Sequence, residues 1–241
     1  IISSVLSVSI AVTAFAGFAA SAKAAGYSAW VGYSTNDTTA EWNYGVDHVS
    51  TNTDTGTYDP STGTLTFTED TELIGCDYQS GTYCGSAIIA EGATDLIIDL
   101  AENDVTVDAT RLSNSWIGGI YRNGGSLTIK GPGSLTVTAS GGTAENAALM
   151  GYNGTDISVT GGAKVVLSDA DDNGYGLWAS GQVHINGGSV FEMNGGGGAV
   201  KMMNRGSVDP GENIVTVGSS AGTASEWNGT DDLTAFKYIR I

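Results

Sequence analysis

Residues Gly124–Ala139 read GGSLTIKGPGSLTVTA, and this stretch decides the fold. A glycine turn precedes a small polar residue and an apolar-Thr-apolar alternation, and the same phrase then repeats. Alternation of apolar and polar residues predicts a short β-strand with one buried face. Because two such short strands cannot bury their own apolar face, further copies must pack against them.

The phrase recurs along the chain in five units. Each unit begins with a small residue followed by an aliphatic one, and the starts are 23 to 32 residues apart, at Ala87, Gly119, Ala148, Gly176 and Ala199. This period is typical of one supersecondary unit of a solenoid. Each unit holds three short alternating segments separated by Gly, Asn or Asp, and none has the periodicity of a helix. The sequence therefore predicts an all-β fold, a right-handed parallel β-helix of about five coils with three short strands each. A β-sandwich would not explain why the pattern repeats at the period of a coil.

Aligning the units places apolar residues in columns that should stack inside the solenoid. The first segment supplies Ile88, Ile120, Leu149, Leu177 and Val200. The second supplies two columns, Leu96, Leu127, Ile157 and Val183, then Ile98, Ile129, Val159 and Ile185. The third supplies Val105, Leu135, Val165, Phe191 and Val215, then Val107, Val137, Leu167, Met193 and Val217.

The segments outside these units have other compositions. Residues 1–25 are almost wholly apolar or small and carry Ala22-Lys23-Ala24 near their end. This pattern predicts a secretory signal peptide, incomplete at its start, with a retained membrane anchor as the alternative. Residues 26–86 are expected to form a β-rich cap, with room for one irregular coil, before the β-helix of residues 87–218. Residues 219–241 should cap the other end, and their closing FKYIRI should form a final strand at its edge.

Charge and cysteine content limit the partners and the compartment. The 241 residues include 26 Asp and Glu against 9 Lys and Arg, a net charge of −17, which disfavours nucleic acid and anionic membranes as partners. The two cysteines, Cys76 and Cys84, bracket a short loop, so a disulfide is expected in an exported chain, with two reduced thiols as the alternative.

One outward column differs from the others because it is apolar and aromatic. It consists of Ile89, Tyr121, Met150, Trp178 and Lys201, whereas the other outward columns are mostly Thr, Ser and charged residues. Tyr121 and Trp178 stand two coils apart, which is about 10 Å. Exposed rings at this spacing suit successive units of a neutral glycan, so Tyr121, Trp178, Met150 and Lys201 are candidate glycan-binding residues. The alternative is that the column lies beneath the N-terminal segment or a second subunit.

A second candidate site is the acidic turn DADDNG. Asp169, Asp171, Asn173 and Gly174 match the opening of a calcium loop, whose ligands are hard oxygens at alternate positions. The twelfth position of such a loop is Ser180 rather than Glu, so the bidentate ligand is missing. Ca²⁺ binding and a solvated acidic turn are both compatible with the sequence, and no other cofactor is expected.

Three stretches carry a resemblance to a known group of proteins. They are YDPSTGTLTF at Tyr58–Phe67, GIYRNGGSLTIKGPGSLTVTA at Gly119–Ala139 and WNGTDDLTAFKYIRI at Trp227–Ile241. They resemble exported β-helical repeat proteins of anaerobic bacteria that are often labelled carbohydrate-binding domain proteins. The resemblance implies a secreted or cell-surface role in glycan contact, and it transfers no catalytic residue.

Three functional classes follow, in this order: a glycan-binding module, a structural or self-associating protein of the cell envelope, and a polysaccharide lyase or glycoside hydrolase. An enzyme of the last class would use a basic residue beside carboxylates, for which Lys164 and Asp169 are the candidates. Lys164 is expected near a turn and Asp169 in the following loop, so the sequence assembles no catalytic site and favours a protein that is not an enzyme.

Overall fold

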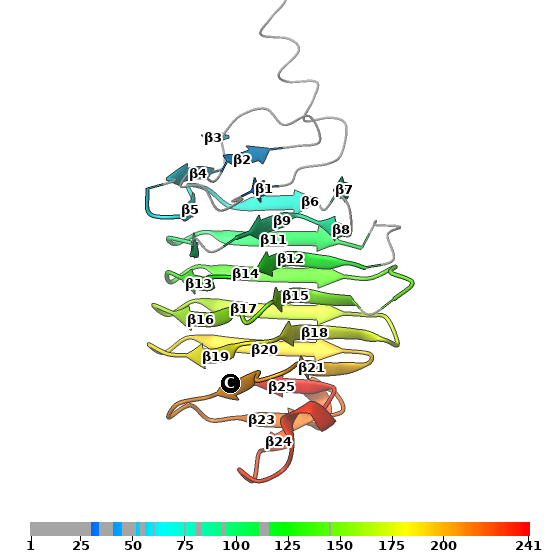
Figure 1. The fold of residues 1–241 in the computed structure, drawn as a ribbon. Coiled ribbons are helices and arrows are strands. Elements are labelled where there is room, and N and C mark those ends of the chain that lie inside the picture. Colours follow the sequence, from blue (N-terminus) through cyan, green and yellow to red (C-terminus); the bar gives the residue numbers. More distant parts are fainter. Residues whose placement is uncertain are drawn as a thin grey trace, which may run out of the picture.

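The computed structural model describes residues 30–33, 41–44, 52–53, 56–59, 61–74, 76–80, 83–92, 95–110, 116–144 and 146–241. The expected signal peptide, residues 1–25, lies outside them. Nearly all of the described elements are strands, and the strands stack in parallel into a β-solenoid (Figure 1). The parallel β-helix expected from the repeats is therefore confirmed.

The strands belong to three long sheets, one for each segment of the repeating unit. In spatial order the first sheet contains β2 (Glu41–Tyr44), β1 (Trp30–Tyr33), β9 (Ile88–Glu91), β12 (Gly118–Asn123), β15 (Asn146–Tyr152), β18 (Gly174–Ala179) and β21 (Gly198–Met202). The second contains β22 (Ser207–Asp209), β19 (Gln182–Ile185), β16 (Asp156–Thr160), β13 (Ser126–Lys130), β10 (Leu96–Asp99), β5 (Thr64–Phe67), β4 (Gly56–Asp59) and β3 (Asn52–Thr53). The third contains β24 (Ser225–Glu226), β23 (Thr216–Gly218), β25 (Tyr238–Arg240), β20 (Val190–Gly195), β17 (Lys164–Asp169), β14 (Ser134–Ala139), β11 (Asp104–Ala109) and β6 (Thr71–Ile74).

Four further described elements lie outside these sheets. Strands β7 (Cys76–Ser80) and β8 (Tyr83–Ser86) form an antiparallel pair. Cys76 and Cys84 stand on these two strands, but their side chains lie outside the described part of the structure, so the disulfide stays a prediction. Two 3-10 helices, η2 (Ala221–Thr223) and η3 (Leu233–Ala235), follow the last coil.

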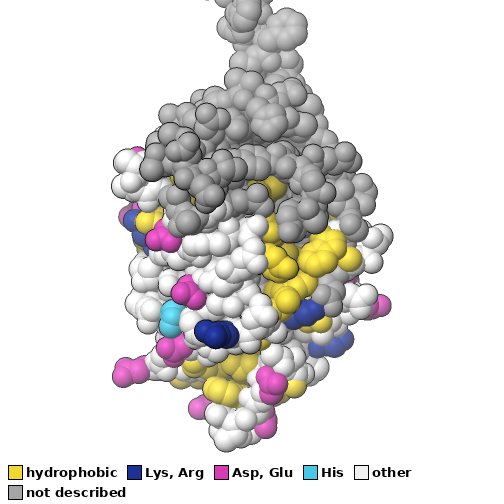
Figure 2. Space-filling model, viewed as in Figure 1, with side chains coloured by type: hydrophobic (Ala, Val, Ile, Leu, Met, Phe, Trp, Pro, Cys, Tyr) yellow, Lys and Arg dark blue, Asp and Glu magenta, His cyan; other side chains and the backbone are white. Residues whose placement is uncertain are grey.

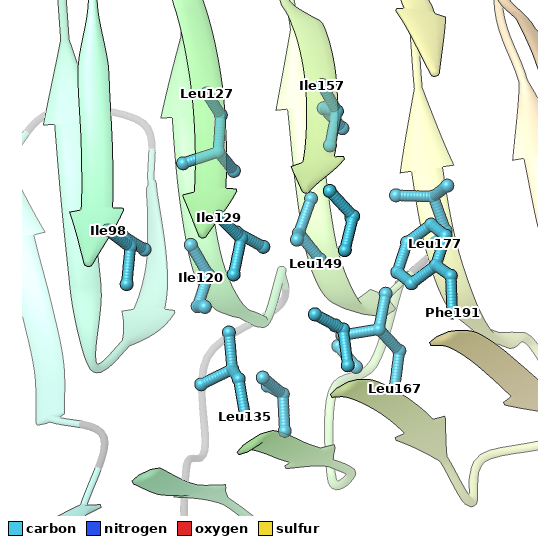
Figure 3. Packing of buried hydrophobic residues seen from close by; sticks show 14 of the residues in the cluster. Ile98, Ile120, Leu127, Ile129, Leu135, Leu149, Ile157, Leu167, Leu177 and Phe191 are labelled. Atoms are coloured by element: carbon cyan, nitrogen blue, oxygen red, sulfur yellow. The ribbon is translucent and has the colours of Figure 1, made fainter. Parts of the chain in front are cut away.

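The residue-to-residue register of the coils agrees with the alignment of the repeats. Ile120 pairs with Ile88 and Leu149, Leu127 with Leu96 and Ile157, and Leu135 with Val105 and Val165. These inner side chains are essentially inaccessible to solvent and belong to one hydrophobic core (Figure 3). The core is continuous because each apolar side chain rests on its equivalent in the next coil, about 4.8 Å away.

The small residue that opens each unit also lies inside the solenoid, directly before its aliphatic neighbour. Ala87, Ala148 and Ala199 are buried in the core, and Gly119 and Gly176 occupy the same position in the coils between them. A Cβ built on Gly119 would lie 2.5 Å from Val137 Cγ1 and 2.8 Å from the Ala148 carbonyl oxygen. The small residue is therefore required by close packing, and two consecutive inward residues interrupt the alternation at this point.

At the N-terminal end, part of the segment assigned to a cap continues the coils. Strand β5 runs parallel to β10, β6 parallel to β11, and β1 parallel to β9. Strands β2, β3 and β4 pair antiparallel with their neighbours. Residues 26–86 thus include both additional solenoid strands and antiparallel pieces among their described parts.

At the C-terminal end, the fifth coil is incomplete because β25 enters the third sheet. FKYIRI does form a strand, but the strand lies antiparallel between β20 and β23, so the expectation of a sheet-edge position is wrong. Ile239 pairs with both Met193 and Val217, and Ile241 exchanges two backbone hydrogen bonds of 2.9 Å with Phe191. Val215 and Val217 are buried as expected, but Ile239 and Ile241 fill the positions next to the last complete coil. Within residues 87–218, the described strands accordingly form four complete three-strand coils.

Candidate functional site

The unusual outward column of the first sheet exists as a physical stack. Tyr121 pairs with Ile89 and with Met150, Met150 pairs with Trp178, and Trp178 pairs with Lys201. These residues project from the outer face, because the inner positions beside them belong to the main core. Tyr121 and Trp178 therefore share one face, as expected from their register.

The expectation that these two rings are exposed is wrong. Tyr121 is 0% and Trp178 2% accessible to solvent, and Ile89 and Met150 are buried with them. They form a second hydrophobic cluster, separate from the core inside the coils, with Trp116, Tyr152, Tyr175 and Met203 packed against it. Periodicity predicts on which side of the sheet a side chain lies, but burial also depends on what packs over that side. Tyr121 and Trp178 are thus the base of the cluster rather than its contact surface.

The outer part of the cluster consists of rings that keep some exposure. Trp116, Tyr152 and Tyr175 are partly buried, and the Trp116 and Trp178 ring centroids lie 5.5 Å apart with a tilt of 30°. Figure 2 shows hydrophobic side chains gathered in a patch on the side of the solenoid where β12, β15 and β18 run, with basic side chains along one border. We call Trp116, Tyr152, Tyr175 and Met203 the aromatic rim.

Lys201 adds a positive charge to this cluster. Its Nζ lies 4.3 Å from the centroid of the Trp178 ring and 5.4 Å from that of the Tyr175 ring. An ammonium over an aromatic face is attracted by the ring quadrupole, so the lysine is held at the cluster. Lys201 is partly buried at the last position of the outward column.

Trp178 also contributes a buried polar atom to the cluster. Its indole Nε1 is buried and has no hydrogen-bond acceptor among the described residues. A buried N–H without an acceptor costs free energy, and such groups in folded proteins usually bond to protein, water or a ligand. The cluster therefore combines apolar rings with two different hydrogen-bond donors, an indole and an ammonium.

The candidate calcium ligands do not converge. Asp169 lies inside the coil with one carboxylate oxygen accepting a hydrogen bond of 3.0 Å from the Asp171 backbone N–H. Asp171 Oδ2 accepts from the Gly141 N–H at 2.7 Å and from Asn146 Nδ2 at 3.1 Å. Asn173 is exposed, and no three His, Cys, Asp or Glu side chains are gathered for a metal ion in the described ranges. N–H donors aimed at a carboxylate oxygen compete with a cation, so this geometry favours a hydrogen-bonded acidic turn.

The candidates for catalysis are likewise separated. Lys164 is exposed at the start of β17, whereas Asp169 is buried at its end. A different arrangement occurs on the second sheet, where Ser158, His184 and Asp209 occupy one outward column. His184 Nδ1 lies 3.5 Å from Asp209 Oδ2, but no hydrogen bond joins Ser158 to His184 in this described region. Without that bond the three residues do not form an activated nucleophile.

Sequence reasoning missed the aromatic rim. Tyr175 directly precedes the Gly176-Leu177 pair and shares its position in the coil with Ala147 and Gly198. Because two consecutive residues of each unit point inward there, simple alternation assigns Tyr175 to the wrong side. Trp116 precedes β12 and would have needed the three-dimensional contact with Trp178 to be recognised.

No protein family, curated protein or solved structure matches this chain. Among the described residues, no helix has both the length and the hydrophobicity to cross a bilayer.

Proposed function

We propose that this chain is a secreted or cell-surface module that binds glycan chains, and that the aromatic rim forms the contact surface. The observation that supports the proposal most directly is a set of partly exposed rings, Trp116, Tyr152 and Tyr175, fixed on a buried aromatic base. Sugar rings expose C–H faces that pack on aromatic faces without desolvating a charge. Rings held rigid by their support lose little conformational entropy when a ligand binds.

The solenoid also supports this function through its shape. Successive coils repeat about every 4.8 Å, so the rim presents side chains along a straight sheet rather than in a deep pocket. A glycan chain is itself a linear repeat and can make several weak contacts along such a surface. The sequence resemblance to proteins labelled as carbohydrate-binding agrees with this arrangement.

The proposal is tested by oligosaccharide titration of the protein and three variants. Trp116→Ala and Tyr175→Ala should each weaken binding about fivefold, since one stacked ring contributes on the order of 1 kcal/mol. Ile214→Ala is the matched control, because Ile214 is 74% exposed and stands away from the rim. Affinity should rise with oligosaccharide length. Unchanged binding in both ring variants, with melting temperatures intact, would rule out the rim as the contact surface.

A structural or self-associating role is the second candidate, and the edge of the second sheet favours it. Strand β22 pairs with β19 on one side and with no described strand on the other. An unpaired strand edge is a template for another chain. In this case the molar mass in light scattering should rise with concentration, Val208→Pro should reduce the rise, and glycans should not bind.

A further inference from the structure

Asparagine-glycine pairs are chemically labile, and this chain has six of them. The backbone nitrogen of the glycine attacks the side-chain carbonyl carbon of the asparagine, because glycine has no side chain to hinder the approach. A glycine N–H that donates a hydrogen bond in the folded protein is held away from this attack, so the reaction then needs local opening of the chain. The hydrogen bonds of the six glycines therefore indicate which pairs react in the folded protein.

Four of the six glycine N–H groups donate a hydrogen bond. Gly124 donates to the Tyr152 carbonyl oxygen at 3.1 Å, Gly154 to Ser180 Oγ at 2.8 Å, Gly174 to the Asp171 carbonyl oxygen at 2.8 Å, and Gly195 to the Lys237 carbonyl oxygen at 3.1 Å. The Gly187 and Gly229 N–H groups donate no hydrogen bond within the part of the chain that the structure describes. Both glycines are exposed, and so are Asn186 and Asn228, which precede them. These two pairs are therefore open to reaction without unfolding.

Asn228 differs from Asn186 because its side-chain carbonyl oxygen accepts two backbone hydrogen bonds. The backbone nitrogens of Thr230 and Asp231 lie 2.9 and 3.1 Å from Asn228 Oδ1. The Asn186 side chain accepts no hydrogen bond from another described residue. Two N–H donors on a carbonyl oxygen polarise the carbonyl and stabilise the negative charge that develops on this oxygen during attack at its carbon. The fold therefore supplies at Asn228 an arrangement that favours the reaction.

We propose that Asn228 is a self-modifying site, at which the folded chain promotes its own conversion of an asparagine to a carboxylate. The Gly229 nitrogen forms a bond to Asn228 Cγ, and the bond from Cγ to Nδ2 breaks. The amide nitrogen leaves as ammonia with the proton that the glycine nitrogen gives up. Water then opens the cyclic imide to aspartate or isoaspartate, so one water is consumed for each ammonia released. The inference does not depend on the proposed glycan contact.

The product should change the loop that contains it. Asn228 Nδ2 donates to Asp231 Oδ2 at 2.8 Å. A carboxylate in place of the amide cannot donate this bond, and it places a second negative charge beside Asp231, so the two groups repel each other. Asp231 also accepts the Trp227 indole N–H through its carbonyl oxygen at 3.0 Å. Modification should therefore open this loop and displace the Trp227 indole N–H signal in NMR spectra.

The test follows all six pairs in one sample. The purified chain is incubated in heavy-oxygen water at mildly alkaline pH, either native or unfolded in urea, and peptide mass spectrometry measures oxygen incorporation at each asparagine. In the native protein Asn228 should convert fastest and Asn186 more slowly. The four pairs with hydrogen-bonded glycines should convert at least about tenfold more slowly than Asn228. In urea the six rates should become similar, because no glycine N–H is then protected. Asn228→Gln should prevent the displacement of the Trp227 signal during incubation.

Three results would contradict the inference. A native Asn228 rate equal to that of Asn153, whose glycine N–H is hydrogen-bonded, would show that Asn228 is not a reactive site in the folded protein. If Asn228 also converts fastest in urea, its local sequence rather than the fold promotes the reaction. Equal native rates at Asn228 and Asn186 would overturn the role of the Thr230 and Asp231 donors.

Discussion

Asp169 is a residue whose pKa is changed by burial inside the solenoid. Its side chain is 2% exposed, between Ala139 and Gly195 of the neighbouring coils, and its Oδ2 is buried with no hydrogen-bond partner in the part of the chain that the structure describes. Burial raises the pKa of this carboxyl to about 7. The hydrogen bond from the Asp171 N–H acts in the opposite direction, and the charge of Asp171 raises the pKa further. The folded protein therefore holds a proton that the unfolded chain releases near pH 4.

This proton makes stability fall with rising pH. Because the folded-state pKa lies above the unfolded one, the contribution of Asp169 is fully present below about pH 4, decreases between pH 4 and 7 and is lost above. Asp169→Asn should therefore match the unaltered protein at pH 4 and exceed its free energy of unfolding by up to roughly 4 kcal/mol at pH 8. Urea denaturation at the two pH values measures this difference. An equal effect of the substitution at both pH values would show that the buried carboxyl does not titrate in this range.

Adjacent residues of one strand should respond very differently to the same substitution. Leu135 is 0% exposed, whereas its neighbour Thr136 faces outward between Thr106 and Val166. Leu135→Asp should cost more than about 4 kcal/mol because it places a charge in the core, while Thr136→Asp should change stability by about 0.5 kcal/mol. Thermal or chemical unfolding compares the two. Similar losses at both positions would contradict the observed register.

At this scale the sequence predicted the inner residues well and the outer ones incompletely. Inner positions follow from alternation, because one face of every strand must meet the core. Tyr121 and Trp178 were assigned to the correct face but the wrong environment, because burial depends on what packs over that face. The Trp178 ring, for example, contacts Trp116, which lies far earlier in the chain.

In the first sheet, two consecutive inward residues interrupt the alternation of each coil, and the geometry of this inward corner depends on residue size. Ala87, Gly119, Ala148, Gly176 and Ala199 alternate between Ala and Gly down the stack. A methyl group on Gly119 would contact both a side chain and a backbone carbonyl at less than normal separation. A small residue followed by an aliphatic one therefore indicates an inward corner where both residues face the core and the first has no room for a larger side chain.

Gly119→Ala tests this corner. The added methyl should cost about 1–3 kcal/mol through overpacking. Gly222→Ala is the matched control, since a Cβ there would meet nothing within 4 Å and its backbone needs no positive φ. The control should change the free energy of unfolding by less than about 1 kcal/mol. Equal effects of the two substitutions in urea denaturation would argue against close packing at the corner.

The last strand shows a limit of sequence reasoning about elements. FKYIRI alternates as a strand should, and β25 forms at that place. Its position between β20 and β23 could not be predicted, because alternation specifies which side chains are buried but not which strands become neighbours. Ile239 occupies the position next to Met193 that the alignment of the repeats assigned to Val217.

For the whole molecule, the period of the repeat was the decisive signal. Five related units at a spacing typical of solenoids predicted the stacking direction, the three sheets and the continuous core. Function was harder to predict because the repeat specifies the inner residues and does not specify which outward residues contact a ligand. The net charge of the chain indicated a neutral ligand, but it does not indicate which residues would contact that ligand.

The central claim, glycan contact at the aromatic rim, is tested most directly by the tryptophan indole N–H signals in an NMR titration with an oligosaccharide. The chain has 5 Trp, of which Trp116 and Trp178 belong to the outer cluster, while Trp227 lies in the C-terminal segment and donates its indole N–H to the Asp231 carbonyl oxygen at 3.0 Å. Binding at the rim should shift the Trp116 and Trp178 signals in a saturable way and leave the Trp227 signal in place. Saturable shifts confined to Trp227, or no shift of the Trp116 and Trp178 signals while the glycan binds, would contradict the assignment of this surface.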